Sequence, residues 1–338
     1  MTVQHDTSMI FLSQTFIMHS RFLIAAVFAT VGWSYPTTSI CTEVDIPVSV
    51  AATRFLITTT IENDWDAVSL TFNLTRRDSG NATTAPLPIA GTTSSPVRSD
   101  FVVGPTFENA ERYSFVDAAV AAGYAVLSYD RIGVGSSSKV DALQDAQFQV
   151  QTAVLDELIV YARKIMNAKH VGLIGHSYGS YLSAGSANHS DVDAVVLTGF
   201  SGAFDYFTPF VAGAGFRIAN QQNTSRWGDL DSAYLTTSDI YATTYIYYKE
   251  PYFEQRVAEW NHHVAAEPFA VGELPSLLAS YNNFHNVTAP VLLLQGQFDL
   301  SACGGNCLGF PKLKDEALRD DVFQNAKSIE VINDLPAG

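Results

Sequence analysis

The sequence predicts an α/β fold in which a mostly parallel, doubly wound sheet is covered by helices. The first observation is that short apolar runs alternate with helical patterns over residues 113–198 and return at 289–333. Such alternation indicates right-handed βαβ crossovers. The second is the pentapeptide Gly175-His176-Ser177-Tyr178-Gly179, which joins an apolar run to small residues able to begin a helix. The third is size and composition: 338 residues, 47% hydrophobic and 16% charged, suffice for one large domain with an insertion.

Residues 1–34 have the pattern of a targeting segment. Arg21 precedes an apolar run at 22–31 that is too short to span a bilayer, and small residues at 30–34 are suitable for cleavage. We expect a signal peptide, with residues 1–17 as an upstream extension, and therefore no stable membrane span after cleavage. The alternative is a buried N-terminal helix.

Further features favour a secreted glycoprotein. Five asparagines lie in Asn-x-Ser/Thr sequons: Asn73, Asn81, Asn188, Asn223 and Asn286. In an oxidising compartment Cys303 and Cys307 can close a small loop, which leaves Cys41 as the odd cysteine. No further Cys or His stands at zinc-ligand spacing, so no metal is predicted. The formal net charge of -15 argues against nucleic acid and anionic membranes as partners.

The predicted elements follow in chain order. Residues 44–60 and 66–73 predict an N-terminal hairpin of the sheet, and 76–100 a polar loop. A short helix at 113–123 precedes a buried strand at 124–129, and the turn at 130–137 lacks the third glycine of a dinucleotide-binding loop. A longer helix is expected at 142–166, and strands at 170–175 and 193–198.

The alternation breaks at residues 202–288, which are rich in aromatic side chains. These are read either as ordinary core or as the lining for an apolar acyl or alkyl group. The set is Phe204, Tyr206, Phe207, Phe210, Tyr241, Tyr245, Tyr247, Tyr248, Tyr252 and Phe253. A strand at 289–296, a helix at 311–327 and a last strand at 328–333 complete the prediction.

The pentapeptide resembles the nucleophile elbow of α/β-hydrolase-fold serine hydrolases, of the secreted kind common in filamentous fungi. The strained turn requires small flanking residues, which Gly175 and Gly179 supply. His176 is the variable residue, and its side chain should point away from the Ser177 hydroxyl. The resemblance implies a core at 44–201, a helical cap insertion at 202–288 and a second, incomplete core part at 289–338.

The resemblance also implies the chemistry. Ser177 attacks the carbonyl of a small-molecule carboxylic ester and forms an acyl-enzyme, while the Tyr178 N–H binds the oxyanion. Asp299 follows a buried strand where the family keeps its acid, and Asp205 is the second candidate. No metal or organic cofactor is implied, and the oligomeric state is not indicated. The alternatives are hydrolysis of another acyl bond, such as a lactone or peptide, and a non-catalytic binding protein.

Two parts of the family pattern are missing. No histidine follows Asp299, whereas relatives continue from the last strand into the catalytic His. Residues 101–109 replace the apolar strand and His-Gly that supply the second oxyanion donor, so a central strand is expected to be shortened or lost. Both gaps favour a truncated or mis-spliced chain, and residues 1–338 are expected to be nearly inactive.

Overall fold

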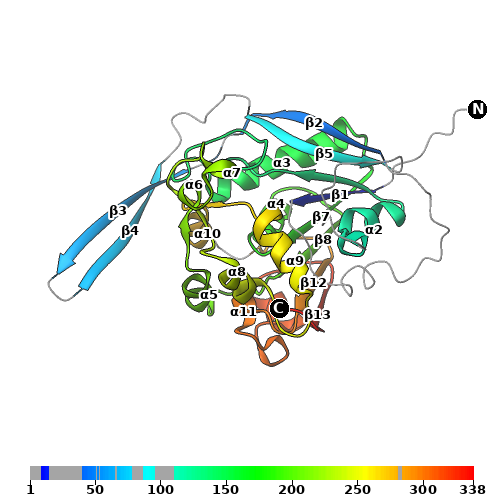
Figure 1. Ribbon diagram of the computed structural model, residues 1–338. Coiled ribbons are helices and arrows are strands. Elements are labelled where there is room, and N and C mark those ends of the chain that lie inside the picture. The colour runs from blue at the N-terminus through cyan, green and yellow to red at the C-terminus, as the bar shows by residue number, and fades with distance from the viewer. Residues whose placement is uncertain are drawn as a thin grey trace, which may run out of the picture.

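The computed structural model describes residues 9–14, 40–50, 52, 54–64, 67–77, 87–95, 110–280 and 284–338. The fold is built on an eight-stranded sheet in the order β13-β12-β8-β7-β1-β6-β5-β2 (Figure 1). Its strands are β1 (Met9–Gln14), β2 (Ile40–Val48), β5 (Leu87–Ser95), β6 (Ala125–Tyr129), β7 (His170–His176), β8 (Ala194–Thr198), β12 (Val291–Gly296) and β13 (Ile329–Leu335). The six strands from β13 to β6 are parallel, and β5 and β2 add antiparallel at the other edge.

Strand β1 corrects the expectation that a central strand is lost. It pairs in parallel with β6, Gln14 opposite Tyr129, and with β7, Ser13 opposite Ile174. A strand with partners on both sides satisfies its backbone groups within the sheet. One strand of the main sheet thus lies within residues 1–17, the range that the sequence analysis assigned to an upstream extension.

The N-terminal β-structure also differs from the prediction. Strands β3 (Arg54–Asp64) and β4 (Ala67–Arg77) do form an antiparallel hairpin, but it is a separate two-stranded sheet that projects from the domain (Figure 1). The pairing partner of β2 is instead β5, at residues 87–95, where a polar loop was expected. Pro, Gly and Thr in this segment suggested a loop, yet Pro88 lies where β5 pairs with β2 alone, because the ladder with β6 begins at Gly91. At such a position one side of the strand has no ladder to interrupt, so Pro is tolerated.

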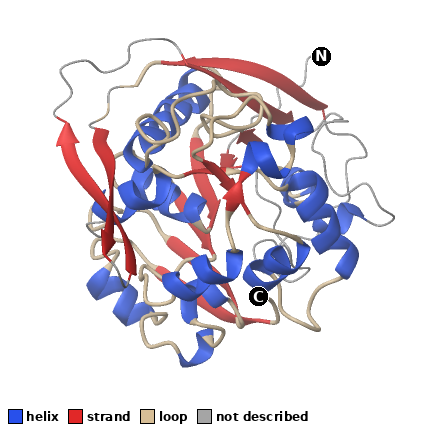
Figure 2. Ribbon diagram, turned by 60° about the vertical axis from the view of Figure 1, so that its left-hand side comes forward, coloured by secondary structure: helices blue, strands red, loops and turns tan. Residues whose placement is uncertain are grey.

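Helices surround the sheet (Figure 2). The larger helices of the core are α2 (Phe115–Ala121), α3 (Phe148–Lys164), α4 (Tyr178–Ala187) and α12 (Asp315–Asp321). Helix α2 begins at the Ser114 cap, whose Oγ accepts a hydrogen bond from the Asp117 N–H, and it is followed by Gly123 at φ 91°. The main hydrophobic core lies between helices α3 and α4 and the sheet, where Leu158 and Leu173 are completely buried.

The segment between β8 and β12 forms its own small structure. It contains helices α5 (Phe207–Ala214), α6 (Ala219–Gln222), α7 (Thr224–Trp227), α8 (Ile240–Tyr247), α9 (Gln255–Trp260) and α10 (Glu273–Ser280). Three short strands, β9 (Arg217–Ile218), β10 (Tyr234–Thr236) and β11 (Phe269–Ala270), pair beside them. The predicted fold class, an α/β fold with a parallel central sheet, is confirmed.

Candidate active site

Ser177 occupies a strained turn between β7 and α4. Its backbone has φ 51° and ψ -119°, a conformation that non-glycine residues rarely adopt. The Ser177 N–H donates to the Thr198 carbonyl at 2.8 Å, and its carbonyl accepts from the Ser180 N–H at 2.9 Å. The turn therefore places the serine at the carboxyl edge of the parallel sheet and at the N-terminus of α4. Such a conformation persists only where the surrounding structure enforces it.

Gly175 has no room for a side chain. A Cβ atom there would lie 2.2 Å from the Gly179 carbonyl oxygen, which is backbone and cannot move aside. The requirement for a small residue before the nucleophile is thus met by a direct contact between strand and helix. This close approach also brings Ser180 against β7: its Oγ lies 2.8 Å from both the Gly175 and the Thr198 carbonyl oxygens.

His176 is tied to the end of β8. Its Nδ1 pairs with the Thr198 hydroxyl at 2.8 Å. Burial lowers the pKa of His176, and the Asp299 carboxylate opposes that effect in part. A neutral imidazole is therefore favoured at this position.

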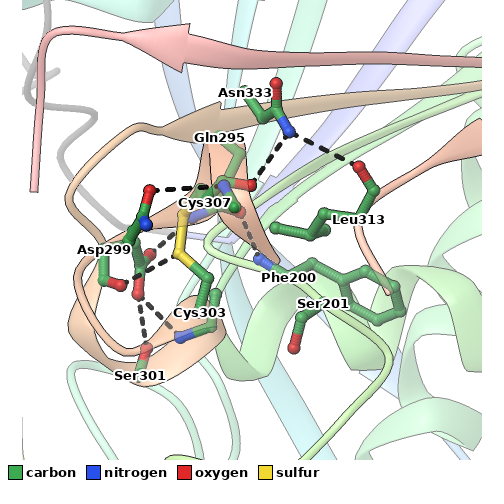
Figure 3. The surroundings of a disulfide bond; sticks show 12 residues. Phe200, Ser201, Gln295, Asp299, Ser301, Cys303, Cys307, Leu313 and Asn333 are labelled. Carbon is green, nitrogen blue, oxygen red and sulfur yellow. Dashed lines mark hydrogen bonds between the residues drawn. A yellow bond between two sulfur atoms is a disulfide. The ribbon is translucent and has the colours of Figure 1, made fainter. Parts of the chain in front are cut away.

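Asp299 lies beyond the end of β12, at the same sheet edge as Ser177. Its carboxylate caps helix α11 (Leu300–Cys303): Oδ1 accepts from the Ala302 N–H at 2.8 Å and from the Ser301 hydroxyl at 3.0 Å. Oδ2 accepts from the Gln295 amide at 2.7 Å. The carboxylate is buried and its orientation is fixed by three donors, as Figure 3 shows.

The loop that carries Asp299 is closed by a disulfide between Cys303 and Cys307 (Figure 3). Both cysteines are buried, and the Cys307 N–H donates to the Gln297 carbonyl at 2.9 Å. On the other side, the Gln297 N–H donates to the carbonyl of Leu335, the last residue of β13, and the Phe298 N–H donates to the carbonyl of Ala337. The segment after β12 is therefore fixed on two sides.

An aromatic pocket opens beside Ser177. It has a volume of about 120 Å³ and is lined mainly by rings from the segment between β8 and β12. Of the aromatics singled out in the sequence, four line it: Phe204, Phe207, Phe210 and Tyr247. Phe216 and Phe269 add two that the sequence analysis did not single out. Ser301 and Ala302 of α11 belong to the same wall, which places the Asp299 loop next to the pocket.

The other predicted aromatics have different places. Tyr248 is buried in a separate cluster with Tyr113 and Val257. Tyr241, Tyr245 and Tyr252 are exposed. The two readings of this segment, core and pocket lining, therefore apply to different residues.

A buried ion pair forms part of the pocket wall. Arg131, from the turn after β6, pairs through Nη1 with Glu273 of α10, and both side chains are buried. Gln151 of α3 bonds to both partners, at 3.3 Å to Arg131 and 3.0 Å to Glu273. The guanidinium lies over the ring of Tyr178, 5.3 Å from its centroid. These residues were missed in the sequence because nothing local connects positions 131 and 273.

The remaining candidates lie elsewhere. Asp205 forms an exposed ion pair with Lys312 at 2.8 Å, which lowers the pKa of Asp205. His262, on the segment after α9, bonds to the Thr243 hydroxyl. In the described part of the chain, no histidine side chain lines the pocket. Asp205 is thus directed to a surface lysine rather than to the site.

Four of the five sequon asparagines lie among the described residues, and the predicted oxyanion segment does not. Asn286 is exposed, the Asn188 amide oxygen accepts from the Asn286 N–H, and Asn223 caps α7. Asn73 lies in β4 opposite Thr58, whereas Asn81 and residues 101–109 lie outside the described residues. Among the described residues no His, Cys, Asp and Glu cluster is placed to hold a metal, and none of their helices is long and apolar enough to cross a membrane.

The family follows from a sequence match that spans these features. Residues 91–325 match the family described as the alpha/beta hydrolase family, which covers β6 through α12 and includes both Ser177 and Asp299. The chain belongs to the alpha/beta hydrolase family. No curated protein matches it. Its membership agrees with the parallel sheet and with the strained serine between β7 and α4.

Solved structures of two esterases and of another hydrolase are similar at low identity. An esterase from Exiguobacterium antarcticum is 15% identical, with a TM-score of 0.45 over 73% of this chain and 87% of that one. An esterase from Thermogutta terrifontis is 16% identical, with a TM-score of 0.46 over 76% and 88%. A 2-hydroxy-6-oxo-6-phenylhexa-2,4-dienoate hydrolase from Rhodococcus is 13% identical, with a TM-score of 0.46 over 85% and 92%.

Proposed function

We propose that this alpha/beta hydrolase cleaves carboxylic esters through an acyl-enzyme on Ser177. The observation that carries the proposal is the strained serine at the mouth of an aromatic pocket, with a buried carboxylate at the same sheet edge. Fixing Ser177 at positive φ is costly, and such strain is kept where it presents a reactive group. Neither the fold nor the family match supports the expectation of an inactive chain.

The oxyanion would be bound at the start of α4. The first N–H groups of a helix have no intrahelical acceptor, so the Tyr178 N–H is available for the oxygen that becomes negative. A second donor in this family comes from the loop after the strand next to the elbow strand. In this chain β1 is that neighbour, since it pairs with β7.

The general base has to contact both Ser177 and the acid. A serine hydroxyl is a weak nucleophile until a base takes its proton, and Asp299 is positioned to orient an imidazole. His176 Nδ1 is not available for this role, because the Thr198 hydroxyl binds that nitrogen. We propose that an imidazole oriented by Asp299 accepts the proton; among the described residues that line the pocket none is a histidine.

The pocket favours a neutral substrate with an apolar acyl group. Its walls are mostly aromatic, and its one buried cation, Arg131, is neutralised by Glu273. A substrate carboxylate would lose its water without gaining an unpaired cation, which disfavours acidic esters. An aromatic or branched acyl group, by contrast, would gain contact with the phenylalanines.

The test is the turnover of p-nitrophenyl butyrate by Ser177→Ala. We expect kcat to fall by about 10⁴-fold or more, because the triad acts as a unit. Ser186→Ala is the matched control, since it removes another α4 serine hydroxyl, which bonds to Asp156 and does not line the pocket. Equal turnover by wild type and Ser177→Ala would reject the nucleophile. Full folding with no turnover by the wild type would favour the binding-protein alternative.

A further inference from the structure

Beyond the nucleophile and the acid, the geometry points to Gln295 as a positioning residue for Asp299. We infer that Gln295 fixes the orientation of the Asp299 carboxylate for catalysis, an inference that rests on the proposed role of Asp299 as the acid. Gln295 is the penultimate residue of β12 and its side chain is completely buried. It stands four residues before Asp299 and touches it directly.

The glutamine amide joins two loops at the carboxyl edge of the sheet. Its Oε1 accepts from the Phe200 N–H at 2.9 Å, in the loop after β8. Its Nε2 donates to Asp299 Oδ2 at 2.7 Å, in the loop after β12 (Figure 3). The amide therefore spans from the loop after β8 to the acid.

The direction of this amide follows from its partners. A backbone N–H can only donate, so the glutamine oxygen has to face Phe200. The Nε2 group then faces Asp299, where an ionised carboxylate can only accept. Both hydrogen bonds specify the same orientation, and a flipped amide would break both. The donor is consequently locked onto one carboxylate oxygen.

The same contacts leave space for one more partner. A carboxylate offers roughly four lone-pair positions. Gln295, Ser301 and the Ala302 N–H fill three of them. About one position then remains to accept the N–H of an imidazole, which is the contact that an acid of a Ser-His-Asp triad makes. Without Gln295 the carboxylate would be held through Oδ1 alone, by the Ser301 hydroxyl and the Ala302 N–H, and Oδ2 would lose its protein donor.

A purely structural role would have different consequences. A buried glutamine needs hydrogen-bond partners wherever it lies, and Gln147 illustrates this. Gln147 is also completely buried, and its amide pairs with the backbone of Phe55 and Leu143, away from the pocket. Loss of either glutamine should reduce stability, but only Gln295 should be coupled to the acid.

The experiment is a double-mutant cycle between Gln295→Met and Asp299→Asn, with p-nitrophenyl butyrate as substrate. We expect Gln295→Met alone to lower kcat by about 10²-fold, the effect of a small misplacement in an active site, with KM changed less than about threefold. In the Asp299→Asn background the same change should cost less than about twofold, because the group it positions is already gone. Gln147→Met should lower the unfolding temperature and keep kcat.

Gln295→Glu supplies a second measurement, the pH dependence of kcat, which a purely structural role would leave unchanged. One carboxyl oxygen keeps the Phe200 bond, and the other replaces the Asp299 donor. When protonated it donates as the amide did, and when ionised it repels Asp299, so kcat of this variant should fall as pH rises relative to wild type. Near-wild-type kcat in Gln295→Met would overturn the inference. So would an equal loss of kcat with Asp299 present and with Asp299→Asn. Neither result would affect the proposed function, which Ser177→Ala tests separately. Full activity of Asp299→Asn would overturn the acid assignment, and the inference with it.

Discussion

At the scale of single residues, the site depends on one unfavourable backbone conformation. A non-glycine residue at positive φ costs of order 1–3 kcal/mol. Ser177 tolerates it because the Ser180 hydroxyl and the Thr198 backbone hold both sides of the turn. Thr198 also binds His176, so the end of β8 serves as a common anchor for the elbow.

His176 should make stability depend on pH. Its pKa in the folded protein lies below the ordinary value of 6.5 because the ring is buried. Between those two pKa values the unfolded chain binds more protons than the folded protein. The contribution of neutral His176 to the free energy of unfolding is therefore complete above about pH 6.5 and is lost as pH falls. We expect the free energy of unfolding to decline from pH 7 to 5, and less steeply in His176→Gln. Urea titrations across this range measure it, and identical slopes in the two proteins would contradict the role of His176.

The sequence predicted the residues that belong to short local patterns. Ser177 is surrounded by a recognisable pentapeptide, and Asp299 follows an apolar strand at a fixed interval. Gln295, Ser180 and Thr198 could not be found in this way. Gln295 stands only four residues before Asp299, but its bond to Phe200 spans 95 positions, and the Ser180–Thr198 bond spans 18. Their hydrogen bonds depend on which strands become neighbours, and no local motif states that.

At the scale of elements, the pocket combines a fixed sheet edge with aromatic residues from the segment between β8 and β12. Phe207 and Phe210 come from α5, and their rings stack with centroids 6.2 Å apart. Arg131 and Glu273 tie the turn after β6 to α10. Separating such a buried pair by removing one partner typically costs about 3–5 kcal/mol. The same contacts thus shape the pocket and hold this segment on the core.

The aromatic wall should set acyl selectivity. Phe207→Ala removes a lining ring, and we expect kcat/KM for p-nitrophenyl benzoate to fall about 10-fold more than for the acetate, a typical value for lost pocket contacts. Tyr241→Ala is the matched control, because Tyr241 belongs to the same segment but is 82% exposed and does not line the pocket. A uniform loss for both esters would show that Phe207 does not contact the acyl group.

The sequence predicted five of the six parallel strands of the main sheet and missed one. Strands β6, β7, β8, β12 and β13 follow from short apolar runs, whereas β1 was missed because its six residues precede a segment with signal-peptide features. A six-residue apolar run can be a strand or part of a buried helix, and its own sequence does not decide between the two. The helix expected at 142–166 begins at Phe148, since residues 141–147 form turns held by the Asp141 carboxylate.

At the scale of the whole molecule, the N-terminal residues are either removed as a signal peptide or kept as strand β1 of the sheet. Export with removal of residues 1–34 remains a prediction from the sequence, and the Cys303–Cys307 disulfide and the exposed Asn286 are compatible with it. The same cleavage would remove β1 and leave β6 and β7 without their shared partner. One mature molecule cannot have both features.

We expect the sheet to require β1. A chain of residues 35–338 would expose two strand edges in the middle of the sheet, which favours aggregation. Its unfolding temperature should be lower than that of residues 1–338 by at least about 5 °C, if it unfolds cooperatively at all. Calorimetry of both chains measures this. Equal unfolding temperatures would show that β1 is dispensable and would favour cleavage.

The most direct test of the central claim is to label the protein with a fluorophosphonate and locate the adduct by peptide mass spectrometry. Such a probe bonds covalently to a serine that an enzyme has activated as a nucleophile. We predict one phosphonyl group per chain, on the peptide that carries Ser177, and a loss of esterase turnover in proportion to labelling. Full turnover in protein that carries no adduct on Ser177 would contradict the account.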